Sequence, residues 1–282
     1  DKFEKFIVEP RVSMSKRISN SVQLKLLGEF KHQNTSQIIN FQNDFLGVEK
    51  RRWQLADSDT IPIIQSKQVS GGASYSNNGW LIDIEGYYKN VDGITTQSQG
   101  FTTKYEFTRA KGSYDVKGID VLARKKIGKV SSWLSYSYMK NDYTFESLED
   151  ILFPSNFDST HSFSVGSTFS IEPFDLSIGG NWRTGAPTSL PSIEIPIISN
   201  EVNFGIANNT RLPDYFRLDV SGKYKFNLGQ GTKAEIGAAI WNITDQENII
   251  NYYYRPDSEG NAQQFDRASL GLTTNFVAKV YF

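Results

Sequence analysis

The stretch Ser269-Leu-Gly-Leu-Thr-Thr-Asn-Phe-Val-Ala-Lys-Val-Tyr-Phe282 decides the fold of this 282-residue chain, because apolar and polar side chains alternate along it. One face of an extended strand would carry Leu270, Leu272, Phe276, Ala278, Val280 and Phe282, and the other Gly271, Thr273, Asn275 and Lys279. A strand that is apolar on one side, polar on the other and closes with phenylalanine is typical of a transmembrane β-barrel. The stretch therefore predicts a membrane-spanning strand.

The same period of two recurs along the whole chain. Its clearest instance runs from Phe216 to Leu228, where the even positions are mainly apolar and the odd positions are Arg, Asp, Ser, Lys, Lys and Asn. Strict alternation over that length indicates a strand with two unlike faces. About eleven such segments can be counted, beginning near Phe6, Val22, Lys67, Gly79, Tyr114, Val130, Ser162, Asp175, Tyr215, Thr232 and Phe265. Many reach the roughly 9–11 residues that a tilted strand needs to cross a bilayer.

The connections between these segments alternate between short and long. Tight turns rich in Gly, Asn and Pro are expected at residues 19–20, 77–79, 127–129, 172–174 and 229–231. Long connections are expected at residues 34–65, 97–109, 146–160, 188–213 and 251–264, although 98–109 could hide a further strand. Short periplasmic turns and long external loops are the outer-membrane pattern. Eleven strands with Phe282 at the periplasmic rim would leave Asp1 outside the cell, so we expect only part of an even-numbered barrel.

Composition supports a barrel and excludes several other classes. Aromatic residues make up 13% of the chain, which suits the aromatic girdles of a barrel at its two water interfaces. The sequence contains no run of about 18 apolar residues, so a membrane-spanning helix is not predicted. The net charge of −1 gives no footprint for nucleic acid, so none is expected as a partner. The absence of cysteine removes disulfides, thiolate metal sites and cysteine nucleophiles.

Several short motifs, in order, resemble one known family. They are the opening Phe6-Ile-Val-Glu-Pro-Arg-Val-Ser13, Gly118-Ile-Asp120, Trp182-Arg-Thr-Gly-Ala-Pro187, Arg211-Leu-Pro-Asp-Tyr-Phe-Arg-Leu-Asp219, Trp241-Asn-Ile-Thr244 with Asn248, and the terminal Phe282. Together they resemble the C-terminal half of the barrel of TonB-dependent outer-membrane receptors. The resemblance covers nearly the entire chain, so residues 1–282 are interpreted as the C-terminal part of such a barrel, with the plug domain outside this sequence.

The resemblance implies an all-β fold, a transmembrane antiparallel barrel of about 22 strands, of which about eleven are here. It implies uptake of a scarce, bulky nutrient, such as a siderophore, vitamin, oligosaccharide or peptide, across the outer membrane of a Gram-negative bacterium. Its implied partners are outer-membrane lipid and lipopolysaccharide, a plug domain, the N-terminal half of the barrel and the TonB complex, which the missing N-terminal region would contact. Glycan and peptide importers of the family add a surface lipoprotein over the mouth. Neither a cofactor nor a metal is expected.

Two sets of candidate site residues follow from the pattern. Residues on the polar strand face would line the lumen and contact the plug: Lys25, Glu29, Asp83, Glu85, Arg183, Arg217, Asp219 and Lys223. Both signs of charge occur among them, which suits hydrogen bonds and ion pairs with a plug. Residues of the external loops would contact the ligand: Arg51, Arg52, Trp53, Tyr252, Tyr254 and Arg255. Arginine beside aromatic rings favours anionic or planar ligands, and an aromatic girdle is the alternative reading.

Catalysis is not predicted, but it defines one alternative. The string Asp158-Ser-Thr-His161-Ser162 contains the residue types of a hydrolase, yet a catalytic triad needs convergence in space, not adjacency in the chain. A smaller, autonomous outer-membrane barrel with hydrolase activity is therefore kept as one alternative. A soluble β-rich binding domain is the other.

Overall fold

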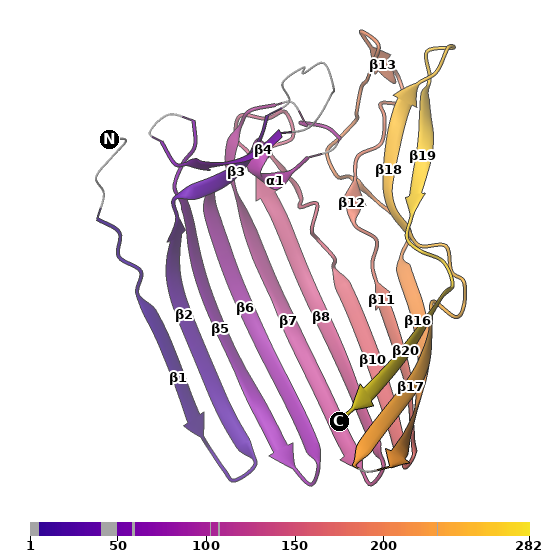
Figure 1. The fold of residues 1–282 in the computed structure, drawn as a ribbon. Helices are drawn as coiled ribbons and strands as arrows, with labels where there is room; N and C mark the ends of the chain where they lie inside the picture. Colours follow the sequence, from indigo (N-terminus) through magenta and orange to yellow (C-terminus); the bar gives the residue numbers. More distant parts are fainter. Residues whose placement is uncertain (1–5, 41–49, 58–59, 102, 107, 230) are drawn as a thin grey trace.

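A computed structural model describes residues 6–40, 50–57, 60–101, 103–106, 108–229 and 231–282. Its main element is one antiparallel sheet in which eleven strands follow one another in chain order (Figure 1). They are β1 (Arg11–Arg17), β2 (Val22–Gln33), β5 (Ile64–Asn77), β6 (Trp80–Thr95), β7 (Lys111–Ile127), β8 (Val130–Thr144), β10 (His161–Ile171), β11 (Phe174–Arg183), β16 (Tyr215–Gly229), β17 (Thr232–Trp241) and β20 (Thr273–Tyr281). The predicted number of barrel strands is confirmed.

Smaller elements lie in the long connections. A short strand β9 (Leu152–Pro154) adds to the end of β8, and a single four-residue helix is described, α1 (Thr96–Gln99). Four further pairs of strands form separate two-stranded sheets: β3 (Thr35–Asn40) with β4 (Lys50–Leu55), β12 (Pro187–Thr188) with β15 (Thr210–Arg211), β13 (Ile197–Ile198) with β14 (Glu201–Val202), and β18 (Ile249–Pro256) with β19 (Ala262–Ala268).

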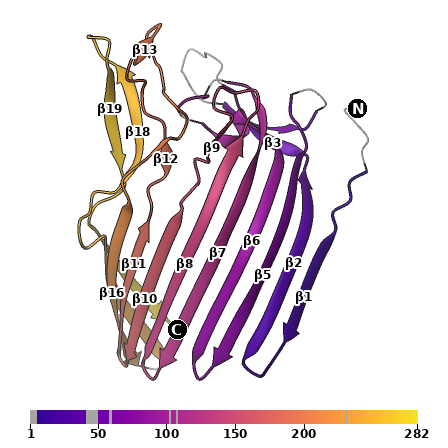
Figure 2. The ribbon, with the colours of Figure 1, turned by 180° about the vertical axis from the view of Figure 1, so that it is seen from behind.

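The predicted tight turns lie at one end of the sheet, and the long connections lie at the other (Figures 1 and 2); residue 230, in the last of these turns, lies outside the described residues. The turn between β5 and β6 shows why its residues suit it. Asn78 and Gly79 both have positive φ, 46° and 75°, as a two-residue hairpin turn of the primed type requires. Asparagine and glycine tolerate that backbone conformation better than other residues. The predicted separation of turns and loops is confirmed.

Two strand boundaries differ from the expectation. β1 begins at Arg11, not near Phe6, because Pro10 has no N–H to donate to a ladder. The segment near Phe265 belongs to β19, which pairs with β18 outside the main sheet, so the last barrel strand begins only at Thr273. The described part of residues 98–109 contains the end of α1 and no barrel strand, so the further strand considered there is not found in it.

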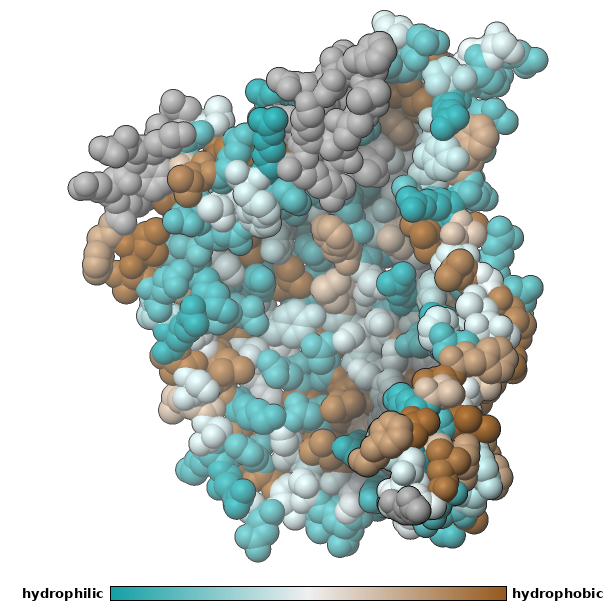
Figure 3. Space-filling model, viewed as in Figure 1, coloured by the Kyte–Doolittle hydropathy of each residue, from teal (hydrophilic) through white to brown (hydrophobic). Residues whose placement is uncertain are grey.

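The register gives the sheet two chemically different faces. Leu176 lies opposite Gly222, which lies opposite Ala238 and then Phe276, so one apolar row crosses four strands. Side chains on this apolar face stay about half exposed: Ile84 47%, Leu176 51%, Ile236 50%. Polar side chains occupy the opposite face. Figure 3 looks onto the hollowed side of the sheet, where hydrophilic and neutral residues cover most of the centre and strongly apolar ones gather toward the margins.

Neither edge of the main sheet is closed. Within the described chain, β1 is hydrogen-bonded only to β2, and β20 only to β17. Every residue of β1 is exposed. Unpaired edges of this length carry rows of N–H and C=O groups that need a partner strand.

No helix in the described parts of the chain is long and apolar enough to cross a membrane.

Candidate ligand pocket at the loop end of the sheet

The long connections are held by a compact aromatic core at the loop end of β6, β7 and β8. Its centre is formed by Phe101, Tyr143, Phe145 and Phe153, which are at most 4% exposed. The rings of Phe145 and Phe153 stack with centroids 6.1 Å apart, and Phe101 meets Tyr143 edge to face at 5.5 Å. Such packing buries large apolar areas in defined ring geometry. The loops therefore have a fixed structure that can position a site.

Asp150 joins three of these loops through one carboxylate. Its Oδ2 lies 2.7 Å from Lys104 Nζ and accepts hydrogen bonds from the Tyr105 hydroxyl at 2.8 Å and the Ala207 N–H at 3.0 Å. Tyr105 also accepts a hydrogen bond from the Asp150 N–H. Lys104 is only 15% exposed and has a second carboxylate partner, Glu149, at 3.1 Å. The contacts link the connections before β7, before β9 and before β15.

The charges of this cluster stabilise one another. Burial works to raise the pKa of Asp150, but the hydrogen bonds from Lys104, Tyr105 and Ala207 outweigh it, so the pKa is lowered. Burial likewise works to lower the pKa of Lys104, yet its bonds to Asp150 and Glu149 leave that pKa raised. Both groups are therefore ionised at neutral pH.

A pocket of about 710 Å³ opens beside this cluster. Its described lining comes from four segments: residues 103–106 with Thr108, Glu149, residues 201–204, and the β18 residues Tyr253, Tyr254 and Pro256. The ring of Tyr254 meets that of Phe204 edge to face at 6.0 Å, which joins the β18–β19 hairpin to the neighbouring loop. A concave space of this size, with aromatic walls and a few polar groups, is the usual form of a small-molecule site.

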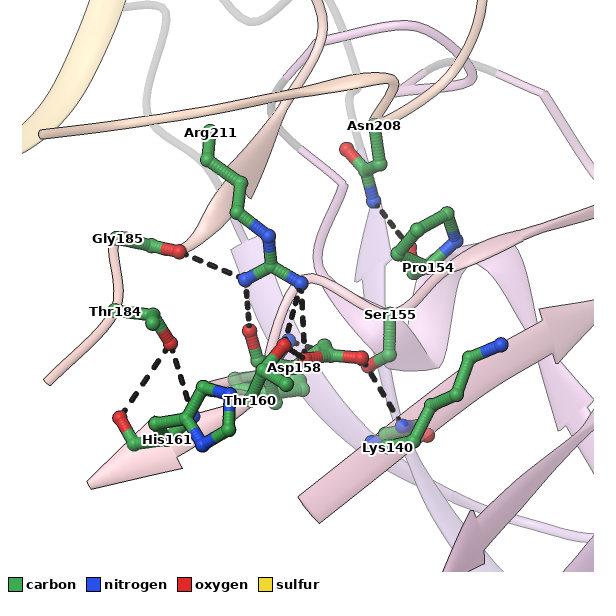
Figure 4. Close-up of polar contacts among 12 residues, drawn as sticks. Lys140, Pro154, Ser155, Asp158, Thr160, His161, Thr184, Gly185, Asn208 and Arg211 are labelled. Atoms are coloured by element: carbon green, nitrogen blue, oxygen red, sulfur yellow. Dashed lines mark hydrogen bonds and ion pairs between the residues drawn. The ribbon is translucent and has the colours of Figure 1, made fainter. Parts of the chain in front are cut away.

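A second polar network anchors the loops to the sheet (Figure 4). Arg211 donates from one nitrogen to the carbonyls of Asp158 and Gly185, both at 2.9 Å, and from the other to Asp158 Oδ1 at 3.1 Å and Thr160 Oγ1 at 2.8 Å. The carboxylate of Asp158, 2% exposed, also accepts the N–H of Asn141. Asn208 adds hydrogen bonds to Pro154 and Asn156. This network positions the connections on either side of the pocket loops.

The same network gives no support to the hydrolase alternative. Asp158 is paired with Arg211, while His161 Nδ1 lies 2.9 Å from the hydroxyl of Tyr136, on the apolar face. Ser162 is the neighbour of His161 in the strand and points to the opposite face. Among the described residues, no group of three or more His, Asp or Glu side chains could hold a metal ion.

The register brings the predicted lumen residues onto one face. Lys25, Gly72, Glu85, Asp120, Ser137, Ser162 and Arg183 form one continuous row across seven strands. On the same face, Lys25 pairs with Asp83 at 2.8 Å and Arg217 with Asp219 at 2.7 Å, while Lys223 lies 3.4 Å from Glu235. Glu29 pairs with Lys31 at 2.7 Å. Their contact with a plug stays a prediction.

The predicted ligand residues fall into two separate places. Arg52 and the 67% exposed Trp53 lie on the β3–β4 hairpin, and neither lines the described pocket; the side chain of Arg51 lies outside the described residues. Tyr254 lines the pocket, whereas the guanidinium of Arg255 packs 5.6 Å from the rings of Tyr253 and Phe265. Tyr252 lies beside them on β18. Their role in binding stays a prediction.

Sequence reasoning missed Lys104, Tyr105, Asp150 and Phe204. Asp150 is 45 residues away from its partner Tyr105 in the sequence and 57 away from Ala207, and these positions share no local pattern. The length of the loops was the only signal, and it indicates a loop region but not which of its residues form the pocket.

A sheet of long, consecutive antiparallel strands, apolar on one face and charged on the other, defines an outer-membrane-type β-barrel wall. A sequence profile described as "TonB dependent receptor-like, beta-barrel" matches residues 63–244, and the chain belongs to that family. No match was found among curated proteins.

Solved structures of similar fold agree with this assignment. The ferric citrate transporter FecA matches with a TM-score of 0.66 at 13% identity, over 96% of this chain and 37% of its own. The ferric yersiniabactin uptake receptor FyuA from Yersinia pestis gives 0.65 at 11%, over 96% and 37%. The FrpB iron transporter from Neisseria meningitidis gives 0.63 at 12%, over 97% and 39%. The chain thus spans less than two fifths of these proteins.

Proposed function

We propose that residues 1–282 form the C-terminal part of the barrel of an outer-membrane receptor that takes up a scarce, bulky nutrient. The substrate class would be a siderophore, vitamin, oligosaccharide or peptide, and energy would come through the TonB complex. One observation carries the proposal: a two-faced sheet of eleven long strands has short turns at one end and a folded loop region with a pocket at the other. The similar structures, described as transporters and receptors, support a transport role over an enzymatic one.

The partners follow from the surfaces of the sheet. Its apolar face would contact lipid and, near the loops, lipopolysaccharide, which supports the proposed location in the outer membrane of a Gram-negative bacterium. Its polar face would contact a plug domain, and the plug side of the receptor would contact TonB. The open edges of β1 and β20 would pair with the remaining barrel strands, because an unpaired edge in hydrocarbon leaves backbone groups unsatisfied.

Uptake by the intact receptor tests this function. Cells that carry the receptor gene should accumulate a radiolabelled substrate from a panel of iron chelates, cobalamin, oligosaccharides and peptides. Deletion of the receptor gene, or of tonB, should abolish the accumulation. Accumulation that persists without TonB would contradict the energised mechanism, and identical accumulation without the receptor would contradict the transport role.

A further inference from the structure

The charge of the pocket beside Asp150 restricts what it can bind. Its described lining carries the carboxylates of Glu149 and Glu201 against one ammonium group, Lys104, while Glu106, which also lies in the lining, has an interaction of its own and is not counted. The charge of Lys104 is already matched by Glu149 at 3.1 Å and by Asp150 at 2.7 Å. An anionic ligand in this pocket would thus meet an excess of like charge, which is unfavourable.

Lys104 shows that these surroundings can hold an organic cation. Lys104 Nζ lies 5.3 Å from the centre of the Tyr105 ring and between two carboxylates, and it stays charged although its side chain is only 15% exposed. An aromatic face next to carboxylates is the surrounding that stabilises an organic cation. The cluster therefore holds one ammonium group from the protein at the wall of a space large enough for further ones.

The remaining walls suit hydroxylated rings. Tyr254 and Phe204 contribute aromatic surfaces that meet at 6.0 Å, and Tyr253 adds a third ring that is 43% exposed. Flat aromatic faces pack against the C–H faces of a sugar ring, while carboxylates accept hydrogen bonds from its hydroxyl and amine groups. Among the described residues, the lining includes no arginine, the residue best suited to planar anions.

We propose that this pocket binds a cationic, hydroxyl-rich ligand, an oligosaccharide of amino sugars being the simplest member of that class. The proposal rests on the nutrient-receptor function and narrows its substrate. It departs from the anionic ligands that the neighbouring arginines suggested, because Arg255 packs on Tyr253 and Phe265 and does not line the pocket.

Three hexasaccharides test the charge preference on the purified intact receptor in detergent. They are the glucosamine hexamer, which is cationic at pH 6, its neutral N-acetylated form, and the anionic galacturonate hexamer. Isothermal titration calorimetry at low salt should give the tightest binding for the glucosamine hexamer and the weakest for the galacturonate hexamer. Equal or tighter binding of the galacturonate hexamer would overturn the proposal, and so would the absence of binding by all three.

Matched variants locate the effect in the pocket. Glu201→Gln should weaken binding of the glucosamine hexamer about fivefold, the value of one unit charge pair near 4 Å in water, and leave the neutral hexamer unchanged. Glu259→Gln, at the turn of the β18–β19 hairpin and outside the described lining, is the control and should change neither. Equal effects of both variants would overturn the assignment to this pocket. TonB-dependent uptake of another substrate would leave the transport function intact while the proposed ligand class fails.

Discussion

The sheet and the loop region of this chain are built on opposite physical principles. Apolar side chains of the sheet, such as Ile178 and Ile236, stay about half exposed on an open face. In the loop region, Tyr143 and Phe145 are fully buried in a core of aromatic rings. Burial away from water stabilises the loops, as in a soluble domain. The strands instead expose an apolar surface that suits contact with the hydrocarbon of a bilayer. The sheet is therefore stabilised by hydrogen bonds between its strands and by the surrounding lipid.

The largest effect is expected from removing a ring in the loop core. Phe145→Ala leaves a cavity between Phe101, Tyr143 and Phe153 and should destabilise the loop region by about 3–5 kcal/mol. Limited proteolysis of the intact receptor in outer-membrane vesicles should then cut the loops and spare the strands. Phe157→Ala, 65% exposed in the same connection, is the control. Equal protease resistance of Phe145→Ala and wild type would contradict an independent loop core.

A charge on the apolar face of the sheet should have the next largest effect. Ile178→Arg places a guanidinium on the face shared with Val220 and should lower folding stability in lipid by about 2–4 kcal/mol if it lies near the bilayer centre. Ser177→Arg, one residue away on the polar face, should cost much less. Folding of both variants into liposomes, followed by urea titration, measures the difference. Equal losses would show that the two faces do not differ in their surroundings.

Breaking the Asp150 cluster should have a smaller effect, confined to the loops. Asp150→Asn removes the main partner of the poorly exposed Lys104 and should destabilise the loop region by about 2 kcal/mol, below the roughly 3–5 kcal/mol of a fully buried pair. Glu149→Gln removes the other partner, which is 82% exposed, and should cost less than about 1 kcal/mol. Hydrogen exchange of the Ala207 amide monitors the cluster. Unchanged exchange in Asp150→Asn would contradict its role as the junction of three loops.

Acid should produce the smallest effect. The pKa of Asp150 is lowered from an ordinary value of 3.8, so its stabilising contribution is present above that value and is lost as pH falls through the lower folded pKa. Lys104, with a raised pKa, stays charged throughout. The difference in loop melting temperature between wild type and Asp150→Asn should therefore narrow as pH falls from about 6 toward about 3. A difference that is constant over this range would contradict the ionic origin of the cluster's stability.

The sequence predicted the sheet far better than the loops, and the reason is the range of the determining interactions. Alternation along Phe216 to Leu228 is local, because neighbouring side chains of a strand point to opposite faces whatever the rest of the chain does. The five tight turns were located by their Gly, Asn and Pro residues, which are also a local signal, whereas alternation located the strands. Alternation failed at Phe265, where β19 alternates like a barrel strand but pairs with β18 outside the main sheet. The alternation of side chains along a strand does not show with which other strand it pairs.

The pocket could not be predicted for the same reason. Lys104, Asp150 and Phe204 come from three connections whose positions depend on the aromatic core beneath them. The prediction rested instead on arginines next to aromatic residues in the sequence. Of these, Arg52 and Trp53 lie on β4 and do not line the described pocket, and Arg255 packs on rings of its own hairpin. Among the described residues, Tyr254 alone was both predicted as a ligand residue and found in the lining.

A scan of single cysteines along β16 tests the two-faced sheet most directly, since the chain has no cysteine of its own. Spin labels at each position from Arg217 to Tyr224, in the intact receptor in liposomes, report access to oxygen, which concentrates in lipid, and to a water-soluble nickel chelate. A two-faced strand predicts that access alternates with a period of two, with oxygen favoured at Leu218, Val220 and Tyr224. Uniform access along the strand, or nickel access at Leu218 and Val220, would contradict it.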